Sequence, residues 1–163
     1  LVTFIILLWQ HQSRRSTSHI SKISNDTEGV AEPILEDDKK VFNQIRLLME
    51  QEQRFLQHDL KTIDIANSLK VSEYRISRAI RTMSAAANVN QFINSYRISF
   101  AKQLLTSKHS EHWTILVISM ESGFASLAPF NRAFKASEGC TPNQYRQRYL
   151  HKEVVDHHPV VPS

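Results

Sequence analysis

Two stretches of the chain carry polar side chains at helical spacing, opposite an apolar face. In residues 72–83 the positions predicted to face outward are Tyr74, Ser77, Arg78 and Arg81. An arginine can bind guanine through two hydrogen bonds, and a hydroxyl group can bond to either partner of a base pair. We therefore predict that Arg78 reads a base with help from Tyr74 and Ser77, and that Arg81 binds a phosphate.

Residues 126–137 show the same arrangement. Ala128, Asn131, Arg132 and Lys135 share a face opposite an apolar stripe. Its residues Leu127 to Pro129 offer no side-chain hydrogen bond to a base. We expect this half to read thymine methyl groups or DNA shape, and to position the protein mostly through phosphates. We predict base contacts for Ala128, Asn131 and Arg132, and a phosphate contact for Lys135.

Further phosphate contacts are expected at helix starts. The N-terminus of a helix favours an anion, because its free N–H groups and the helix dipole point at the ligand. Thr62 and Thr114 each begin a predicted helix, so both are candidates. The guanidinium of Arg146 is a third candidate.

Other chemistries fit the sequence less well. His109 and His112 are spaced i, i+3, but neither a carboxylate nor a cysteine accompanies them as in known zinc sites. The three glycines form no phosphate-cradling loop, and no Ser/His/Asp set stands out. Cys140 is interpreted as a turn residue. We therefore predict a protein without a metal ion, a cofactor or enzymatic activity.

Composition favours one helical domain with appendages. The chain has 163 residues, 41% of them hydrophobic, and only 3 glycines. Its net charge is +4, and the excess of bases lies between residues 58 and 150, with 12 basic and 6 acidic side chains. Residues 24–38 hold six acids and no base. This distribution is the one that phosphate binding requires. A single cysteine excludes an intramolecular disulfide and fits a reducing compartment.

The most informative stretch reads as a helix, a tight turn and a second helix. Thr114 caps the first helix, and Gly123 ends it in the left-handed conformation that glycine adopts freely. Ser126 caps the second helix, with Pro129 in its first turn, and Gly139 ends it. A helix pair of this kind with a basic outer face is typical of a DNA-binding helix-turn-helix.

Four further helices are predicted upstream. In residues 58–83, caps at Thr62 and Ser72 begin a second helix pair. Residues 90–106 are apolar on two sides, so this helix should pack against both pairs and hold them at a fixed separation. Its Arg97 either pairs internally, which we favour, or reaches phosphate. Residues 39–57 form an amphipathic helix that covers the domain, or else a short dimerising coiled coil.

The residues from Ile115 to Arg146 resemble the signature of the AraC/XylS family of bacterial transcription regulators. The Phe-Ile-Asn-x-Tyr-Arg-Ile run at residues 92–98 resembles the family's connecting helix. The chain departs from the family at Ile80-Arg81, where Phe-Lys is usual, and at Ala85–Ala87, where a glycine is usual. The resemblance implies a transcription regulator that binds double-stranded promoter DNA and contacts RNA polymerase. It also implies that the predicted base-reading positions match those that touch bases in the family.

The ends of the chain lead to separate predictions. Residues 1–9, LVTFIILLW, precede basic residues, which suits the end of a transmembrane helix leaving on the cytoplasmic side. A buried strand or the start of a soluble protein is the alternative. Residues 10–38 are predicted as a flexible acidic and serine-rich linker, 39–150 as the DNA-binding domain, and 151–163 as a disordered tail. We expect a cytoplasmic domain attached to the inner membrane, dimerising through an upstream region.

The sequence therefore predicts an all-α fold of about seven helices, with two helix-turn-helix units joined by a central connecting helix. The two recognition helices, at about 72–83 and 126–137, would read successive major-groove segments. Such segments lie about 34–36 Å apart. The competing hypothesis is a helical adaptor that binds protein or membrane and not DNA.

Overall fold

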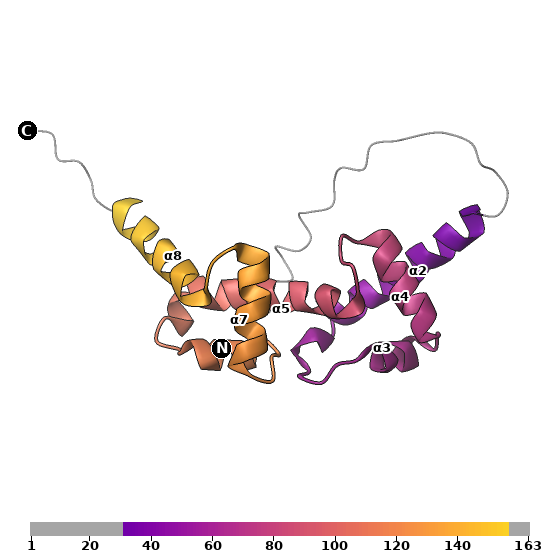
Figure 1. Ribbon diagram of the computed structural model, residues 1–163, viewed down its shortest axis with the longest axis horizontal. Helices are drawn as coiled ribbons and strands as arrows, with labels where there is room; N and C mark the ends of the chain where they lie inside the picture. The colour runs from indigo at the N-terminus through magenta and orange to yellow at the C-terminus, as the bar shows by residue number, and fades with distance from the viewer. Residues whose placement is uncertain (1–30, 157–163) are drawn as a thin grey trace, which may run out of the picture. The chain divides into compact units, whose positions relative to one another are not determined.

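The computed structural model describes residues 31–156, and it describes side-chain surroundings for residues 34–149. Within residues 31–156 all regular elements are helices, seven of them α-helices, as the sequence predicts. Figure 1 shows them along the chain. They are α2 (Ala31–Glu50), η1 (Arg54–Leu56), α3 (Thr62–Leu69), α4 (Glu73–Met83), α5 (Val89–Thr106), η2 (Lys108–Ser110), α6 (Ile115–Glu121), α7 (Leu127–Glu138) and α8 (Pro142–Asp156).

The chain forms two compact units. Among the described residues, unit 1 comprises 31–55 and Asp59–Ile93, so it holds α2, α3, α4 and the start of α5. Unit 2 comprises Leu56–His58 and 94–156, so it holds the rest of α5 with α6, α7 and α8. Each unit contains one of the predicted helix pairs, α3–α4 or α6–α7.

The core of unit 1 lies between α2 and α4, which pack against each other. Val41, Ile45 and Met49 from α2 are buried, as are Ile76 and Ile80 from α4. Each such side chain contributes about 1.5–3 kcal/mol through removal of apolar surface from water. The amphipathic helix therefore covers the domain, as we favoured over the coiled coil.

The bounds of α2 differ from those predicted. The helix begins at Ala31 and not at Lys39, so residues 31–38 are helical and do not belong to the predicted linker. Pro33 is accommodated because it lies in the first turn, where no N–H is needed. The helix ends at Glu50 and not at Gln57. Gln53 follows in a left-handed conformation with φ of 52°, which separates α2 from η1.

The C-terminal boundary also differs. Helix α8 extends to Asp156, so residues 151–156 are helical and not part of a disordered tail. Those six residues contain neither glycine nor proline, and nothing in them breaks a helix. Residues 1–30 and 157–163 lie outside the described residues, as do the predictions of a membrane helix at 1–9, a linker at 10–30 and a tail at 157–163.

Local hydrogen bonds fix the helix starts. Ser72 Oγ accepts from the backbone N–H of Arg75 at 3.4 Å. Thr114 Oγ1 accepts from the backbone N–H of Val117 at 3.2 Å. Both residues are N-caps as predicted. The prediction for Thr62 is wrong, because Lys61 occupies the N-cap of α3 and Thr62 is the first helical residue. The carboxylate of Asp64 accepts from the backbone N–H of Lys61 at 2.8 Å, which is the contact that the third helical residue makes in a capping box.

The turn between α6 and α7 follows the predicted pattern. Gly123 has φ of 84°, and Gly139 ends α7 with φ of 70°. Ser126 is the N-cap of α7, although its side chain makes no capping hydrogen bond. These two glycines adopt the conformation that other residues take at a cost, so the chain can reverse at both points.

Aromatic side chains hold unit 2 together. The rings of Phe124, Phe130, Phe134 and Tyr145 form successive edge-to-face contacts, with centroids 5.2–5.6 Å apart. This geometry favours the positive ring edge against the negative ring face. The series joins the turn, α7 and α8, and so holds α7 against the core of unit 2.

Buried Arg97 is a structural residue of the same unit, as we favoured. Its Nη2 donates to the backbone carbonyl of Gln57 at 2.6 Å, and its guanidinium lies over the ring of Phe124 at 5.5 Å. Burial lowers the pKa of Arg97 below its ordinary value.

No helix between residues 31 and 156 is long and apolar enough to cross a bilayer.

Candidate nucleic-acid interface

Helix α4 presents its predicted base readers on the side away from its buried residues. Tyr74 is 64% exposed, whereas Ile76, Ala79 and Ile80 are buried. Ser77 and Arg78 are half-buried. The Arg78 guanidinium lies 5.4 Å from the centroid of the Tyr74 ring. The three predicted residues thus share one face of the helix, and two of them are in contact.

Arg78 is also bound to acids from α2. Its Nε donates to Asp38 Oδ1 at 2.7 Å, and its Nη2 donates to Asp37 Oδ2 at 3.3 Å. The hydrogen bond to Asp38 raises the pKa of Arg78 above its ordinary value, and Tyr74 adds to this while burial acts against it. Arg78 is therefore a permanent cation, with one edge of its guanidinium already occupied.

Sequence reasoning missed Arg75, Asp37 and Asp38. Arg75 donates from Nε to Asp37 at 3.2 Å and from Nη2 to the other oxygen of the same carboxylate. One signal could have revealed the pairing. Asp38 lies three residues before Val41 and seven before Ile45, on the buried stripe of α2. A carboxylate on a buried stripe needs a cationic partner.

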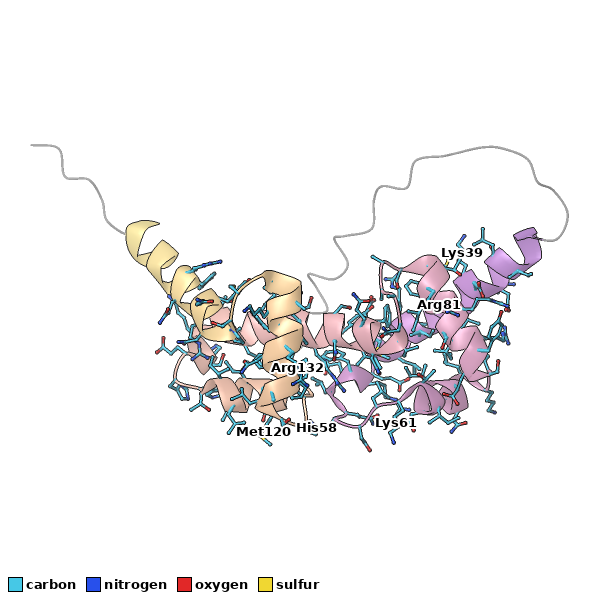
Figure 2. All side chains as sticks on the ribbon, viewed as in Figure 1. Lys39, His58, Lys61, Arg81, Met120 and Arg132 are labelled. Carbon is cyan, nitrogen blue, oxygen red and sulfur yellow. The ribbon has the colours of Figure 1, made fainter. Side chains whose placement is uncertain are left out.

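Three predicted residues of unit 1 line a single hollow. Thr62, Ser77 and Arg81 surround an open space of about 390 Å³ together with residues 87–90 at the start of α5. Arg81, labelled in Figure 2, donates from Nε to the backbone carbonyl of Ser77 at 3.3 Å. A hollow bordered by an arginine and two helix starts has the chemistry of an anion site.

Helix α7 carries the predicted residues of unit 2 on its exposed face. Ala128, Asn131, Arg132 and Lys135 are all exposed, and Phe130 and Phe134 are buried behind them. Arg132 (Figure 2) makes neither an ion pair nor a side-chain hydrogen bond with another residue of the described part of the chain. Arg132 and Lys135 thus present their cationic side chains on the outer face of the helix.

The predicted phosphate contacts of unit 2 differ in accessibility. Thr114 is exposed at the start of α6. Arg146 faces inward, and its Nη1 donates to the backbone carbonyl of Trp113 at 2.8 Å. Nε and Nη2 of Arg146 are buried with no hydrogen-bond partner among the described residues. Burial lowers the pKa of Arg146 below its ordinary value.

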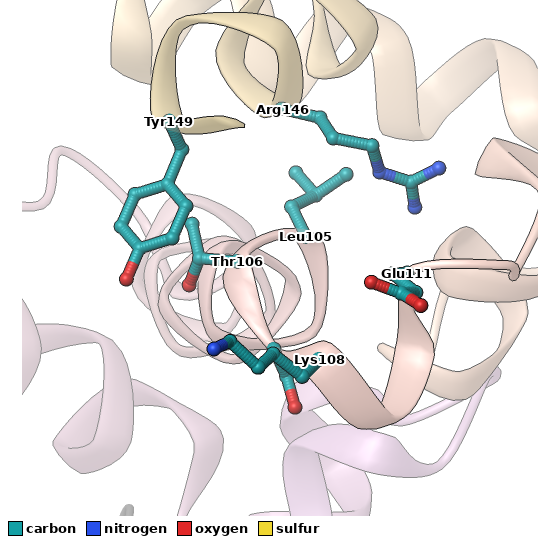
Figure 3. Close-up of a pocket in the computed structure, with 7 residues that line it drawn as sticks. Leu105, Thr106, Lys108, Glu111, Arg146 and Tyr149 are labelled. Atoms are coloured by element: carbon teal, nitrogen blue, oxygen red, sulfur yellow. The ribbon is translucent and has the colours of Figure 1, made fainter. Parts of the chain in front are cut away.

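Figure 3 shows the small cavity beside Arg146, bordered by the end of α5, the η2 segment and α8. Its volume of about 50 Å³ is close to the space of one or two water molecules. Arg146 therefore ties α8 to the segment before α6, and little of its guanidinium is available to a phosphate.

The chain is similar to several known regulators. Residues 65–148 match a family model described as a helix-turn-helix domain. A helix-turn-helix-type transcriptional regulator of Staphylococcus aureus is 34% identical over 113 residues, which cover 69% of this chain and 14% of that protein. The regulatory protein PocR of Salmonella typhimurium is 30% identical over 93 residues, covering 57% of this chain and 29% of PocR. The chain thus spans less than a third of the length of these relatives.

Solved structures show the same fold. The C-terminal domain of AraT, a response regulator from Geobacillus stearothermophilus, is 26% identical, with a TM-score of 0.57 and coverage of 81% of this chain and 98% of that one. A DNA-binding transcriptional dual regulator from Escherichia coli is 19% identical, with a TM-score of 0.54 and coverage of 66% and 96%. At 19% identity the second likeness concerns the fold alone.

Proposed function

Because the chain belongs to the AraC-type helix-turn-helix family of transcription regulators, we propose that it binds double-stranded DNA and reads two successive major-groove segments with α4 and α7. One observation carries this proposal. Both second helices of the two pairs turn an apolar face to the core of their own unit and a polar, basic face to solvent. That is the arrangement of a recognition helix in the major groove.

Base reading is assigned to the exposed faces of these helices. Arg78, with Tyr74 and Ser77 beside it, hydrogen-bonds a base from α4, and guanine offers the two acceptors that a guanidinium fits. Asn131 and Arg132 supply the hydrogen-bond donors of α7, and the methyl group of Ala128 contacts thymine. These roles are supported by the exposure of the α7 residues and by the shared face of the α4 residues.

Phosphate binding is assigned to the margins of the same helices. Arg81 and the helix starts at Thr62 and residues 87–90 form an anion site in unit 1, supported by the hollow that they line. Lys135 and the start of α6 at Thr114 serve unit 2. We propose a smaller part for Arg146, since most of its guanidinium is buried.

The proposal describes a binding module without catalysis. Attachment to the inner membrane through residues 1–9 stays a prediction, because these residues lie outside the described part of the chain. Contact with RNA polymerase and dimerisation through an upstream region also stay predictions. The competing adaptor has one supporting observation, which is that Leu116, Val117 and Met120 of α6 are 39–49% exposed. An exposed apolar cluster of this kind can also bind a protein partner.

The test is selection from a pool of random-sequence DNA duplexes. The chain is expected to retain a subset of duplexes that share a motif, and to hold that motif against excess competitor DNA of random sequence. Specific sites bind about 10³–10⁷-fold more tightly than non-specific DNA in known systems. A pool that emerges without an enriched motif, or no retention of DNA at low salt, would favour the adaptor.

A further inference from the structure

The pair of carboxylates on α2, Asp37 and Asp38, contacts the recognition helix of unit 1. Asp38 binds Arg78 Nε at 2.7 Å, and Asp37 binds both Arg75 and Arg78. The residues joined are 38–41 positions apart in the sequence, so the contact is tertiary. Two of the three arginines of α4 are thereby engaged by acids, and one of them, Arg78, lies against the ring of Tyr74.

Stability alone explains this pair poorly. Helix α2 already packs on α4 through Val41, Ile45 and Met49, which are almost wholly buried. The Asp38 side chain is only 3% exposed, so its carboxylate loses nearly all of its hydration. Replacing such an ion pair by apolar residues is often neutral or stabilising. A role at the DNA-facing surface accounts for the pair better.

The first effect of the pair is on orientation. Arginine has a long and freely rotating side chain, and a base contact needs its planar group in one pose. Here Asp38 binds Nε, the ring of Tyr74 lies against the guanidinium, and Asp37 binds Nη2. Nε and Nη2 share one edge of the guanidinium plane. The neighbouring edge, which contains Nη1, is left to meet a base.

The second effect is on charge. Free arginines on a recognition helix attract phosphates of any sequence, and this attraction supplies most non-specific affinity. The carboxylates of Asp37 and Asp38 offset the charges of Arg75 and Arg78 at close range. A correctly placed base can still accept hydrogen bonds from the free edge of Arg78, whereas the general attraction to phosphate is reduced.

We propose that Asp37 and Asp38 are specificity-determining residues of unit 1. Asp38 is a positioning residue that holds Arg78 in the pose that reads a base. Asp37 lowers the non-specific attraction of Arg75 and Arg78 to DNA. This inference rests on the proposed function, because it assumes that α4 lies against DNA.

The test compares variants of the 163-residue chain on two probes. One probe is the duplex enriched from the random pool by the unaltered chain, and the other is the random pool itself. The variants are Asp38→Asn and Asp37→Asn. The matched control is Glu36→Gln, which removes the same charge from the same turn of α2 but whose carboxylate pairs with Lys39 on its own helix.

Each acid variant is expected to lower the ratio of specific to non-specific affinity by about tenfold, the range of one bidentate base contact. For Asp38→Asn the loss of base preference should be confined to a single base position. That position is defined independently as the one where Arg78→Ala removes base preference. Asp37→Asn should strengthen binding to the random pool and steepen its salt dependence, and Glu36→Gln should leave both affinities near those of the unaltered chain.

Three results would overturn the inference. An unchanged affinity ratio in both acid variants would remove their role. An equal gain of affinity on both probes would overturn it too, because the two acids would then only repel DNA of any sequence. An equal loss of base preference at every position would mean that the two acids serve the structure of the unit and not the reading of one base. Thermal unfolding checks that each variant folds. If Asp38→Asn does not fold, the same affinities are measured with Asp37→Asn and Asp38→Glu. An unaltered chain that enriches no duplex would instead overturn the proposed function itself.

Discussion

At the scale of single residues, the arginines of this chain differ by what surrounds the guanidinium. Arg97 is buried and donates to a backbone carbonyl. Arg78 is half-buried between two carboxylates and a tyrosine ring. Arg132 is exposed on α7. The same side chain is therefore buried at position 97, held by acids at position 78 and a surface cation at position 132, and a substitution should have a different consequence at each site.

Replacing Arg78 by alanine should impair base reading more than general DNA binding. Arg78→Ala removes a candidate bidentate donor and should cost about 1–3 kcal/mol on the selected duplex, with relaxed preference at one base position. Lys135→Ala removes a phosphate contact and should weaken all sequences alike. Binding isotherms on the selected and random duplexes measure both effects. Equal losses on the two duplexes for Arg78→Ala would remove Arg78 from the base readers.

Replacing Arg97 by alanine should destabilise unit 2 without changing base preference. The variant loses a charged hydrogen bond to the Gln57 carbonyl, so the free energy of unfolding should fall by about 2 kcal/mol. Arg148→Ala is the control, because Arg148 is an exposed arginine of the same unit. Urea unfolding gives both values. A loss no larger than that of the control would contradict the structural role.

At the scale of elements, capping residues decide where the recognition helices begin and end. Ser72 begins α4, and Gly139 ends α7 in a left-handed conformation. Apart from Gly139 itself and its two chain neighbours, no residue has a heavy atom within 4 Å of the position that a Cβ at Gly139 would take. The cost of a side chain there is therefore conformational and not steric, which makes this glycine a clean test of the helix end.

Gly139→Ala should lower the free energy of unfolding by about 1 kcal/mol, because alanine takes the left-handed region at a cost. Gly139→Asn should cost less, since asparagine adopts this conformation more readily than alanine. Thermal or urea unfolding measures the difference. If the two variants were equally stable, or if alanine were the more stable, the conformational explanation would be wrong.

How well the sequence predicts an element depends on how local its causes are. The caps at Ser72 and Thr114 and the glycine at position 123 follow from neighbouring residues, and the structure confirms all three. The cap of α3 is mispredicted because Lys61, which is not a preferred N-cap residue, occupies that position, and the Asp64 carboxylate bonds its N–H. The engagement of Arg78 depends on contacts with residues some forty positions away, which helical periodicity does not encode.

At the scale of the whole molecule, acidic and basic side chains are distributed unevenly along the chain. Residues 58–150 carry 12 bases and 6 acids, whereas six acids and no base lie in residues 24–38. The last two of those acids, Asp37 and Asp38, lie against the recognition helix. Binding should therefore depend on a small number of phosphate contacts and not on a large uniform positive field.

The slope of the salt dependence of binding should report the number of those phosphate contacts. The logarithm of the affinity should fall linearly with the logarithm of salt concentration, with a slope that loses about 0.9 for each phosphate contact removed. Arg81→Ala and Lys135→Ala should each reduce the slope by about that amount, and the double variant by about twice as much. Lys39→Ala is the control, because Lys39 is exposed and pairs with Glu36 on its own helix. Mobility-shift titrations between low and physiological salt supply the slopes. A slope that stayed constant in the double variant would show that Arg81 and Lys135 bind no phosphate, and would shift the electrostatic contact to other residues.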